Sequence, residues 1–261
     1  MNHKMRDLRL FVHTLFIIAF LFPITAVAQE KESSDALEVT YQCIYQGFSN
    51  NRQPIFDFFK LTIDEDKSSF CGTTGPEELY KHTVSQNYSV YKNIPNEGFL
   101  VFDKSLLLND FYYQEPMPNF DWEFIDGDTV VCDYACQKAK VNYRHRTWYV
   151  WYTLDLPYSD GPWKLCGLPG LILLAVDSQN DFIFKAIGIQ KTNAQNVAYK
   201  RKGTKVSPQE MASIIKLCYG DFQAYVDKYK KTGPQIVLMG GYKYPSNDIY
   251  LLEYFDEKEK K

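Results

Sequence analysis

The chain has 261 residues and a formal net charge of −3, with 23% charged and 16% aromatic residues. The sequence carries no basic patch or stripe, which excludes nucleic acid as an expected partner, and its net charge is too modest for a disordered chain. The high aromatic content favours a β-rich fold, and the length suits one domain, or one domain with an elaboration.

Residues 1–28 have the three parts of a secretory signal peptide. The segment up to Arg9 is positively charged, residues 10–24 are mainly apolar, and Ala26 and Ala28 provide the small residues that signal peptidase accepts. The alternative is an uncleaved membrane anchor, but a spanning helix needs about 20 apolar residues. We therefore expect cleavage after Ala28 and an exported mature chain without a transmembrane span.

The rest of the chain is organised as one domain. Residues 29–37 are predicted to be a flexible leader, residues 38–255 a single domain and residues 256–261 a charged tail. Within 38–255, short runs rich in β-branched and aromatic residues recur about every 10 residues, with Asn, Asp and Gly between them. This spacing is typical of an antiparallel sheet, and the runs lack the crossover helices that a parallel sheet needs.

The densest segment is 132–176. Within it, Thr147–Pro157 predicts one long strand with bulky side chains on both faces, as expected of a central strand or of one that lines a cavity. Tryptophan side chains combine a large apolar surface with a polar N–H group that seeks a partner. We take four residues of this segment as candidates for ligand or partner binding: Arg146, Trp148, Trp151 and Trp163.

A turn motif follows the long strand. Pro169-Gly170 has the composition of a type II turn, in which Gly170 supplies the positive φ, and Gly167 allows close backbone approach. We interpret the motif chiefly as a structural device that begins the buried strand LILLAV. Its residues are Gly161, Pro162, Gly167, Leu168, Pro169, Gly170, Leu171 and Ile172.

Near the C-terminus the periodicity changes from strand to helix. Ser207 and Glu210 form a capping box, and Pro208 occupies the first helical position. Apolar residues then recur at three- and four-residue steps. The pattern predicts one main helix over about 207–231, whose apolar stripe covers a face of the sheet.

All six cysteines follow the signal peptide, and an even number of cysteines in an exported chain usually forms pairs. We expect disulfides that involve Cys132 or Cys136, with free buried thiols as an alternative. A metal site is not expected, because only His82 and His145 remain after cleavage to complete a zinc site. The disulfide candidates are Cys43, Cys71, Cys132, Cys136, Cys166 and Cys218.

The hexapeptide GLPGLI at Gly167–Ile172 resembles the motif that names the GLPGLI family of exported proteins from Bacteroidetes-type bacteria. CQKA at Cys136–Ala139, Arg146, the strand WYVWYT and GPWK at Gly161–Lys164 also stand where that family's pattern places them. The resemblance covers about residues 38–255 and departs at His145, where the family tends to have Gly, and in the segment SNDIYLLEYF. The family is functionally uncharacterised.

The resemblance implies a compartment and an architecture. It implies a cell-envelope protein, often associated with TonB-dependent outer-membrane receptors, and an open antiparallel sheet similar to the lipoprotein-carrier half-barrel. We therefore expect an α+β fold, mostly antiparallel sheet, packed on one main C-terminal helix. The expected location is the periplasm, with an extracellular or outer-membrane-associated position as the alternative.

Sequence motifs of common enzymes are absent. The chain has no G-x-S-x-G elbow, phosphate-binding loop, dinucleotide fingerprint or H-E-x-x-H, so we assign no catalytic residue and expect no cofactor. The favoured interpretation is a non-catalytic envelope protein that binds an apolar or extended ligand, lipid or peptide, or docks on a TonB-dependent receptor. The alternative is an envelope hydrolase that uses His145 with Cys136 or Cys166, or carboxylates drawn from Asp155, Asp160 and Asp177.

Overall fold

A computed structural model of the chain describes residues 35–45, 55–73, 88–106, 109–193, 197, 199 and 203–229. These residues belong to one compact unit, Ser33–Lys261. The predicted signal peptide and the predicted charged tail lie outside the described residues, so both stay predictions. The first strand begins at Asp35, so the last three residues of the predicted leader belong to the sheet.

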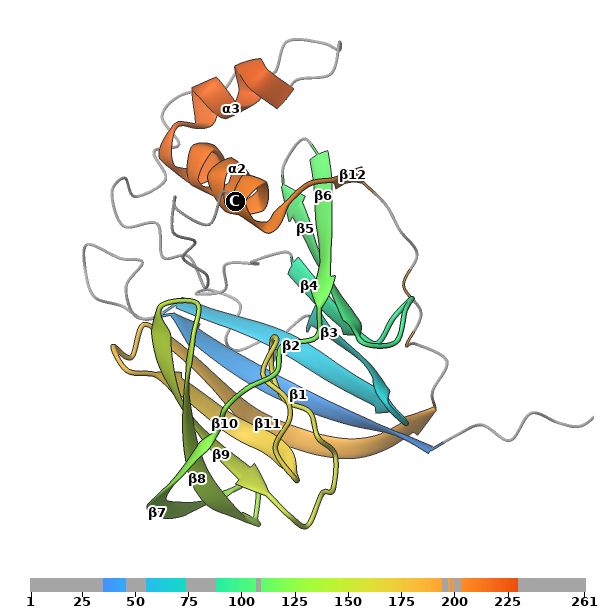
Figure 1. The fold of residues 1–261 in the computed structure, drawn as a ribbon, viewed down its shortest axis with the longest axis vertical. Coiled ribbons are helices and arrows are strands. Elements are labelled where there is room, and N and C mark those ends of the chain that lie inside the picture. The colour runs from blue at the N-terminus through green and yellow to red at the C-terminus, as the bar shows by residue number, and fades with distance from the viewer. Residues whose placement is uncertain are drawn as a thin grey trace, which may run out of the picture. The chain divides into compact units, whose positions relative to one another are not determined.

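In the described part of the chain, twelve strands form one sheet with the order β12-β6-β5-β4-β3-β2-β1-β11-β10-β9-β8-β7 (Figure 1). Neighbouring strands are antiparallel, except that β12 pairs in parallel with β6. The strands are β1 (Asp35–Tyr45), β2 (Ile55–Asp64), β3 (Lys67–Thr73), β4 (Tyr88–Lys92), β5 (Phe99–Leu106), β6 (Asn109–Pro116), β7 (Glu123–Val131), β8 (Tyr134–Tyr143), β9 (Arg146–Thr153), β10 (Leu171–Asp177), β11 (Phe182–Asn193) and β12 (Thr204–Lys205).

Two-residue turns join the strands from β7 to β9. Cys132 (φ 48°) and Asp133 (φ 65°) connect β7 with β8, and Arg144 (φ 50°) and His145 (φ 58°) connect β8 with β9. Two positive φ values in a two-residue loop are those of the type I′ turn, whose twist suits antiparallel strands. By contrast, β9 and β10 are joined by the longer connection 154–170, which contains most of the turn motif.

One face of the sheet carries the core. In β1, the buried residues Val39, Tyr41 and Cys43 alternate with less buried ones, which is the period of a strand covered on one face. Aromatic rings fill much of this core, and Phe59 stacks on Phe70 with 4.6 Å between ring centroids. Burial of this apolar area is the main favourable contribution to folding.

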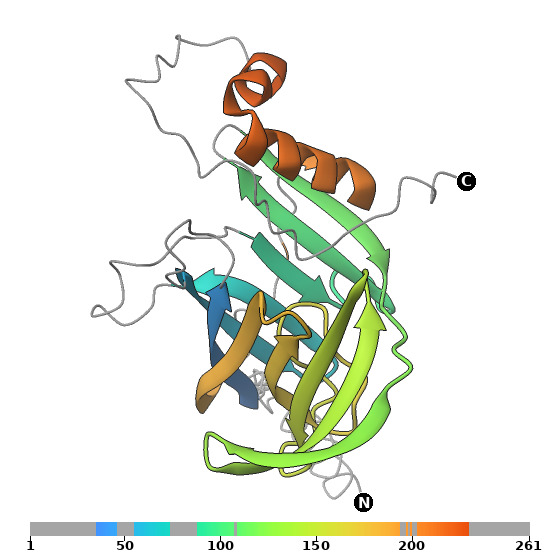
Figure 2. The ribbon, with the colours of Figure 1, turned by 90° about the vertical axis from the view of Figure 1, so that its left-hand side faces the viewer.

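The sheet curls at the end formed by β7 and β8. The Sγ atom of Cys132, in the β7–β8 turn, lies 3.1 Å from the carbonyl oxygen of Ala186 in β11, although β8, β9 and β10 separate β7 from β11 in the sheet order. Figure 2 shows β7 and β8, in yellow-green, as a long curved hairpin. The turn of this hairpin therefore helps to cover the core.

The C-terminal helical segment begins as predicted and is divided into two helices, α2 (Pro208–Gly220) and α3 (Phe222–Tyr229). The Ser207 hydroxyl accepts from the Glu210 N–H at 3.1 Å, and the Glu210 carboxylate accepts from the Ser207 N–H at 2.7 Å. Asp221 breaks the segment, because its backbone is not helical. Helix α2 contacts β6 and buries Met211, Ile214 and Cys218.

The predicted fold class is confirmed: the domain is a mostly antiparallel open sheet with helices near its C-terminal end. None of the described helices is long and apolar enough to cross a membrane.

The expected disulfides are not formed in the structure, where all six cysteines are free. None of the thiols is bonded to another, and several contact other groups instead. Cys71 lies 3.7 Å from the Tyr91 hydroxyl in β4, while Cys132 contacts β11 and Cys136 contacts the carbonyl of Tyr134 at 3.4 Å. An even number of cysteines therefore does not lead to pairing in this fold.

We expect thiol titration in a denaturant without reductant to find all six cysteines free. In the folded protein alkylation at pH 8 should be slow, because burial raises the pKa of the Cys43 thiol well above its usual value and raises that of Cys218 to about 11, and the thiolate is the reactive form. Mass spectrometry after iodoacetamide treatment measures the number of free thiols in the denatured protein and the rate of alkylation in the folded protein. Fewer than six alkylated thiols in the denatured, unreduced sample would contradict the expectation.

Candidate functional site

The candidate site lies on β7, the last strand at one edge of the sheet. β7 pairs with β8 on one side, and no strand among the described residues pairs with its other side. Every residue of β7 except Val131 is exposed or half-buried, and Phe124 and Val130 are 63% and 68% exposed. Among the described residues, β7 therefore presents an edge without a partner strand next to exposed apolar side chains.

A bulge interrupts the middle of β7. Between Ile125 and Thr129, which are both paired with β8, three residues of β7 (126–128) lie opposite the single residue Gln137. A bulge bends its strand, re-aims side chains and is frequent at sheet edges and near binding sites. Here it brings two carboxylates, Asp126 and Asp128, to one pocket.

Gly127 and Trp151 fix the shape of the bulge. Gly127 has a φ of 128°, which side-chain-bearing residues rarely adopt, and a Cβ atom there would lie 2.9 Å from Cδ of Lys138. The indole Nε1 of Trp151 donates a hydrogen bond to the Gly127 carbonyl oxygen at 2.8 Å. Trp151, one of the four predicted binding residues, thus supports the candidate site from the neighbouring strand β9.

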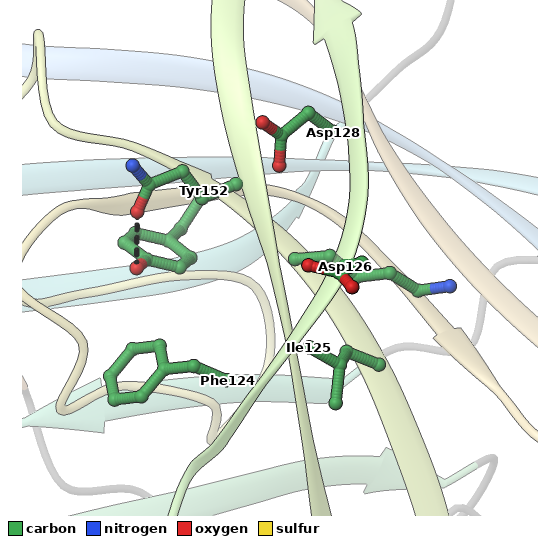
Figure 3. Close-up of a pocket in the computed structure, with 7 residues that line it drawn as sticks. Phe124, Ile125, Asp126, Asp128 and Tyr152 are labelled. Atoms are coloured by element: carbon green, nitrogen blue, oxygen red, sulfur yellow. Dashed lines mark hydrogen bonds between the residues drawn. The ribbon is translucent and has the colours of Figure 1, made fainter.

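A pocket of about 550 Å³ opens at the bulge (Figure 3). This volume is in the range of small-ligand sites. Phe124 and Ile125 point to opposite sides of β7, and Tyr152 lies on the same side as Phe124. The other residues that line the pocket are Asp126, Asp128, Gln137 and Lys138.

Tyr152 is held neutral at the back of the pocket. Its hydroxyl donates to Oε1 of Gln137 at 2.8 Å. Burial raises the pKa of Tyr152, and the nearby carboxylate of Asp128 raises it further. Tyr152 is therefore a fixed part of the pocket wall rather than an acid or base at neutral pH.

The two lysines of β8 are already engaged. Nζ of Lys138 lies 4.8 Å from the ring centroid of Trp151, within cation–π range, and Nζ of Lys140 lies 3.0 Å from the Glu123 carboxylate. Within the described residues, neither Asp126 nor Asp128 forms an ion pair. The pocket therefore presents negative charge beside an exposed aromatic ring.

The other three predicted binding residues lie in the core. Trp148 and Trp163 are both 0% exposed and pack against each other at 5.5 Å between ring centroids. Arg146 is buried, and its guanidinium pairs with Asp177 at 2.6 Å and with Asp181 at 3.1 Å. These three side chains support the sheet and do not line the pocket on β7.

The predicted turn motif is anchored by a buried lysine from β4. Nζ of Lys92 pairs with the Asp160 carboxylate and donates to the carbonyl oxygens of Gly161 at 2.8 Å and Leu165 at 3.2 Å. Gly161 itself must lack a side chain, because a Cβ atom would lie 2.7 Å from Cβ of Ile172. These contacts pack the motif directly against the sheet.

The predicted type II turn at Pro169-Gly170 is wrong in its geometry. Gly170 is not among the glycines with positive φ, whereas Gly167 has a φ of 89°. Gly170 is required for a different reason, since a Cβ atom there would lie only 2.0 Å from the carbonyl oxygen of Thr153. The local sequence correctly indicates that position 170 requires glycine. The reason is the close approach of the β9 backbone and not a positive φ.

The structure does not support the hydrolase alternative. Burial raises the pKa of both Cys136 and Cys166 to about 11, whereas a nucleophilic cysteine needs a lowered pKa. Asp160 and Asp177 are committed to Lys92 and Arg146, as described above. In the described part of the chain, no group of three or more His, Cys, Asp or Glu side chains could hold a metal ion.

The residues that define the pocket are not among the predicted binding residues. Phe124, Asp126 and Asp128 fall in the segment 121–134, whose composition alone predicts one uninterrupted strand. The signal that points to the bulge is Gly127, because glycine inside a strand pattern often marks a bulge.

Residues 135–174 match a family model described as "Protein of unknown function (Porph_ging)". The matched segment contains β9 and most of β8, the turn motif and three residues of the pocket, namely Gln137, Lys138 and Tyr152. No curated protein sequence matches the chain.

Solved structures resemble the domain at low sequence identity. A structure of PNGF-II in the C2 space group gives a TM-score of 0.50 at 17% identity, covering 69% of this chain and 32% of that chain. PNGF-II in the P21 space group gives 0.49 at 18% identity, covering 69% and 33%. A DUF1329 family protein from Desulfovibrio piger ATCC 29098 gives 0.21 at 11% identity, covering 62% and 80%. The chain thus spans about a third of the length of PNGF-II. At 17% identity, the similarity to the C2 structure of PNGF-II shows a shared fold and nothing more.

We expect Gly170→Ala to destabilise the domain by about 3 kcal/mol, because the new methyl group would displace the β9 backbone at Thr153. The matched control is Gly188→Ala in β11, where a Cβ atom would have no neighbour within 4 Å and φ is not positive. Urea unfolding followed by tryptophan fluorescence measures both free energies of unfolding. Equal stability of the two variants would overturn this account of the motif.

Proposed function

We propose that this protein is a non-catalytic binding protein of the cell envelope, in which the open edge of β7 and its pocket hold an extended segment of a partner or ligand. The observation that carries the proposal is the combination, on one strand, of an edge that no described strand pairs with, exposed apolar residues and a pocket at a bulge. An extended peptide adds to such an edge through main-chain hydrogen bonds, and pockets receive its alternate side chains.

The contrast between the two ends of the sheet supports this proposal. At the other end, β12 pairs with Phe111 and Tyr112 of β6, helix α2 contacts β6, and only Pro116 of the β6 residues is exposed. β7 has nine residues, eight of them exposed or half-buried. Proteins usually protect long edges, so an edge of this length with an exposed Phe124 and Val130 needs a partner or a protective device.

The size and lining of the pocket favour a side chain of an extended ligand over a large apolar molecule. About 550 Å³ accommodates one or two large side chains. Its polar wall, Asp126, Asp128 and Gln137, would lose hydration without compensation beneath a lipid chain. The bulky tryptophans Trp148 and Trp163, which could have lined an apolar cavity, are instead packed in the core.

The proposed location is the periplasm. It is supported by the signal-peptide pattern of residues 1–28 and by the resemblance of Gly167–Ile172 to the GLPGLI motif. Through the same resemblance, a TonB-dependent outer-membrane receptor is a candidate partner, since the soluble segments of such a receptor could supply an extended strand. An extracellular or outer-membrane-associated position is the alternative location.

The test is selection of extended nonapeptides from a displayed random library by the purified mature protein. We expect the selected peptides to bind, and Phe124→Ser combined with Val130→Ser to weaken their binding at least tenfold, because both exposed apolar contacts of β7 are removed. Fluorescence polarisation with labelled peptides measures the dissociation constants.

The matched control is Leu154→Ser combined with Ile187→Ser, which removes two exposed apolar side chains (52% and 42%) that do not belong to β7 or line the pocket. This control should bind the selected peptides like the wild type. A library from which no peptide is selected, or equal losses in the two double variants, would refute binding at β7.

A further inference from the structure

We infer that the segment received by β7 is a basic extended peptide, one that places arginine or lysine side chains at alternate positions. This inference rests on the function proposed above and names the chemical class of the partner. It is carried by the charge of the edge, by the contents of the pocket and by the engagement of the neighbouring lysines.

The edge has one sign of charge. Residues 121–133 contain five carboxylates and no lysine or arginine: Asp121, Glu123, Asp126, Asp128 and Asp133. Glu123 is already paired with Lys140 at 3.0 Å. The two carboxylates at the bulge have no such partner within the described residues, and Lys138 on β8 lies over the Trp151 ring. Because Lys138 also lines the pocket, a strand added here meets two carboxylates against one ammonium group, a net negative charge at the centre of the edge.

The pocket has the groups that a guanidinium or ammonium ion requires. Two carboxylates can accept charge-assisted hydrogen bonds from arginine or lysine. The ring of Phe124, 63% exposed, lines the same pocket and offers a face for cation–π contact. The Tyr152 hydroxyl is committed to Gln137, so the carboxylates are the acceptors that stay available.

Charge also argues against a second copy of the chain as the occupant. Antiparallel pairing of two β7 strands about a two-fold axis at Gly127 would place each Asp126 opposite the Asp128 of the other copy. Like charges directly opposite in an antiparallel pair are destabilising. The same carboxylates would repel an acidic peptide or a phosphorylated ligand.

The experiment compares three nine-residue peptides in which valine alternates with arginine, glutamine or glutamate, titrated against the mature protein by fluorescence polarisation. We expect the arginine peptide to bind roughly tenfold more tightly than the glutamine peptide, and the glutamate peptide to bind most weakly. Raising the ionic strength from about 0.1 M to about 0.5 M should reduce the preference for arginine, because exposed ion pairs are screened.

Asp126→Asn combined with Asp128→Asn should abolish the preference for arginine and leave the affinity for the glutamine peptide nearly unchanged. The matched control is Glu97→Gln combined with Asp227→Asn, which removes two exposed carboxylates outside β7 and changes the net charge equally. This control should keep the preference, which separates a local effect from the charge of the whole protein.

The outcomes separate the inference from the proposed function. Equal binding of the arginine and glutamine peptides, both sensitive to Phe124→Ser with Val130→Ser, would overturn the inference and keep the proposed function. Binding of none of the three peptides, together with an unproductive library, would overturn both. Analytical ultracentrifugation tests for a dimer. Dimerisation that is lost when Phe124→Ser is combined with Val130→Ser would identify a second copy as the occupant and overturn the inference.

Discussion

The ammonium group of Lys92 is the contact on which the arrangement of β4, β9 and β10 depends. Lys92 is 2% exposed and lies among Asp160 and the carbonyl oxygens of Gly161 and Leu165, so the connection 154–170 closes around a cation that β4 supplies. A buried ammonium without partners costs several kcal/mol, and therefore strand and connection must be placed together. Lys164 acts in the same way within that connection, since its Nζ donates to Tyr113 and Glu115 of β6 at 2.7 and 2.6 Å.

Because the core is filled, the proposed binding site lies at the edge of the sheet. Because the connection 154–170 places Trp163 against Trp148, the inner face of β9 is used for packing. Side chains alternate along a strand, so Trp151 points away from that core and reaches the carbonyl of Gly127 in β7. A single strand thus supports the core with one tryptophan and the bulge with another. Its two faces contribute differently: the face of Trp148 packs in the core and adds Tyr152 to the wall of the pocket, while Trp151 on the other face supports the bulge.

Features of this domain that depend on a few adjacent residues are predictable from the sequence, and features that depend on distant neighbours are not. The capping box of Ser207 and Glu210 is local, and it forms as the sequence predicts. The end of α2 before Asp221 is not predicted by the sequence, because the apolar repeat continues past this residue into α3. The constraint on Gly170 and the surroundings of the cysteines depend on other strands: the Thr153 carbonyl of β9 lies beside Gly170, Cys132 contacts β11, and Cys71 contacts β4. The bulge depends on both kinds of feature. Gly127 indicates a bulge in the local sequence, but its conformation also depends on Trp151 in β9 and Gln137 in β8.

The acidic bulge resolves a conflict that every long sheet edge creates. Main-chain donors and acceptors on an open edge pair with any strand, including the edge of another copy, and exposed Phe124 and Val130 would add to that tendency. Two carboxylates at the centre of the edge make self-pairing unfavourable, because they would face the same charges. They also make pairing conditional on the partner, since only a segment that brings positive charge to the bulge gains both the main-chain hydrogen bonds and the ion pairs. In the proposed function, protection against aggregation and selection of a partner are therefore two consequences of the same pair of side chains, Asp126 and Asp128.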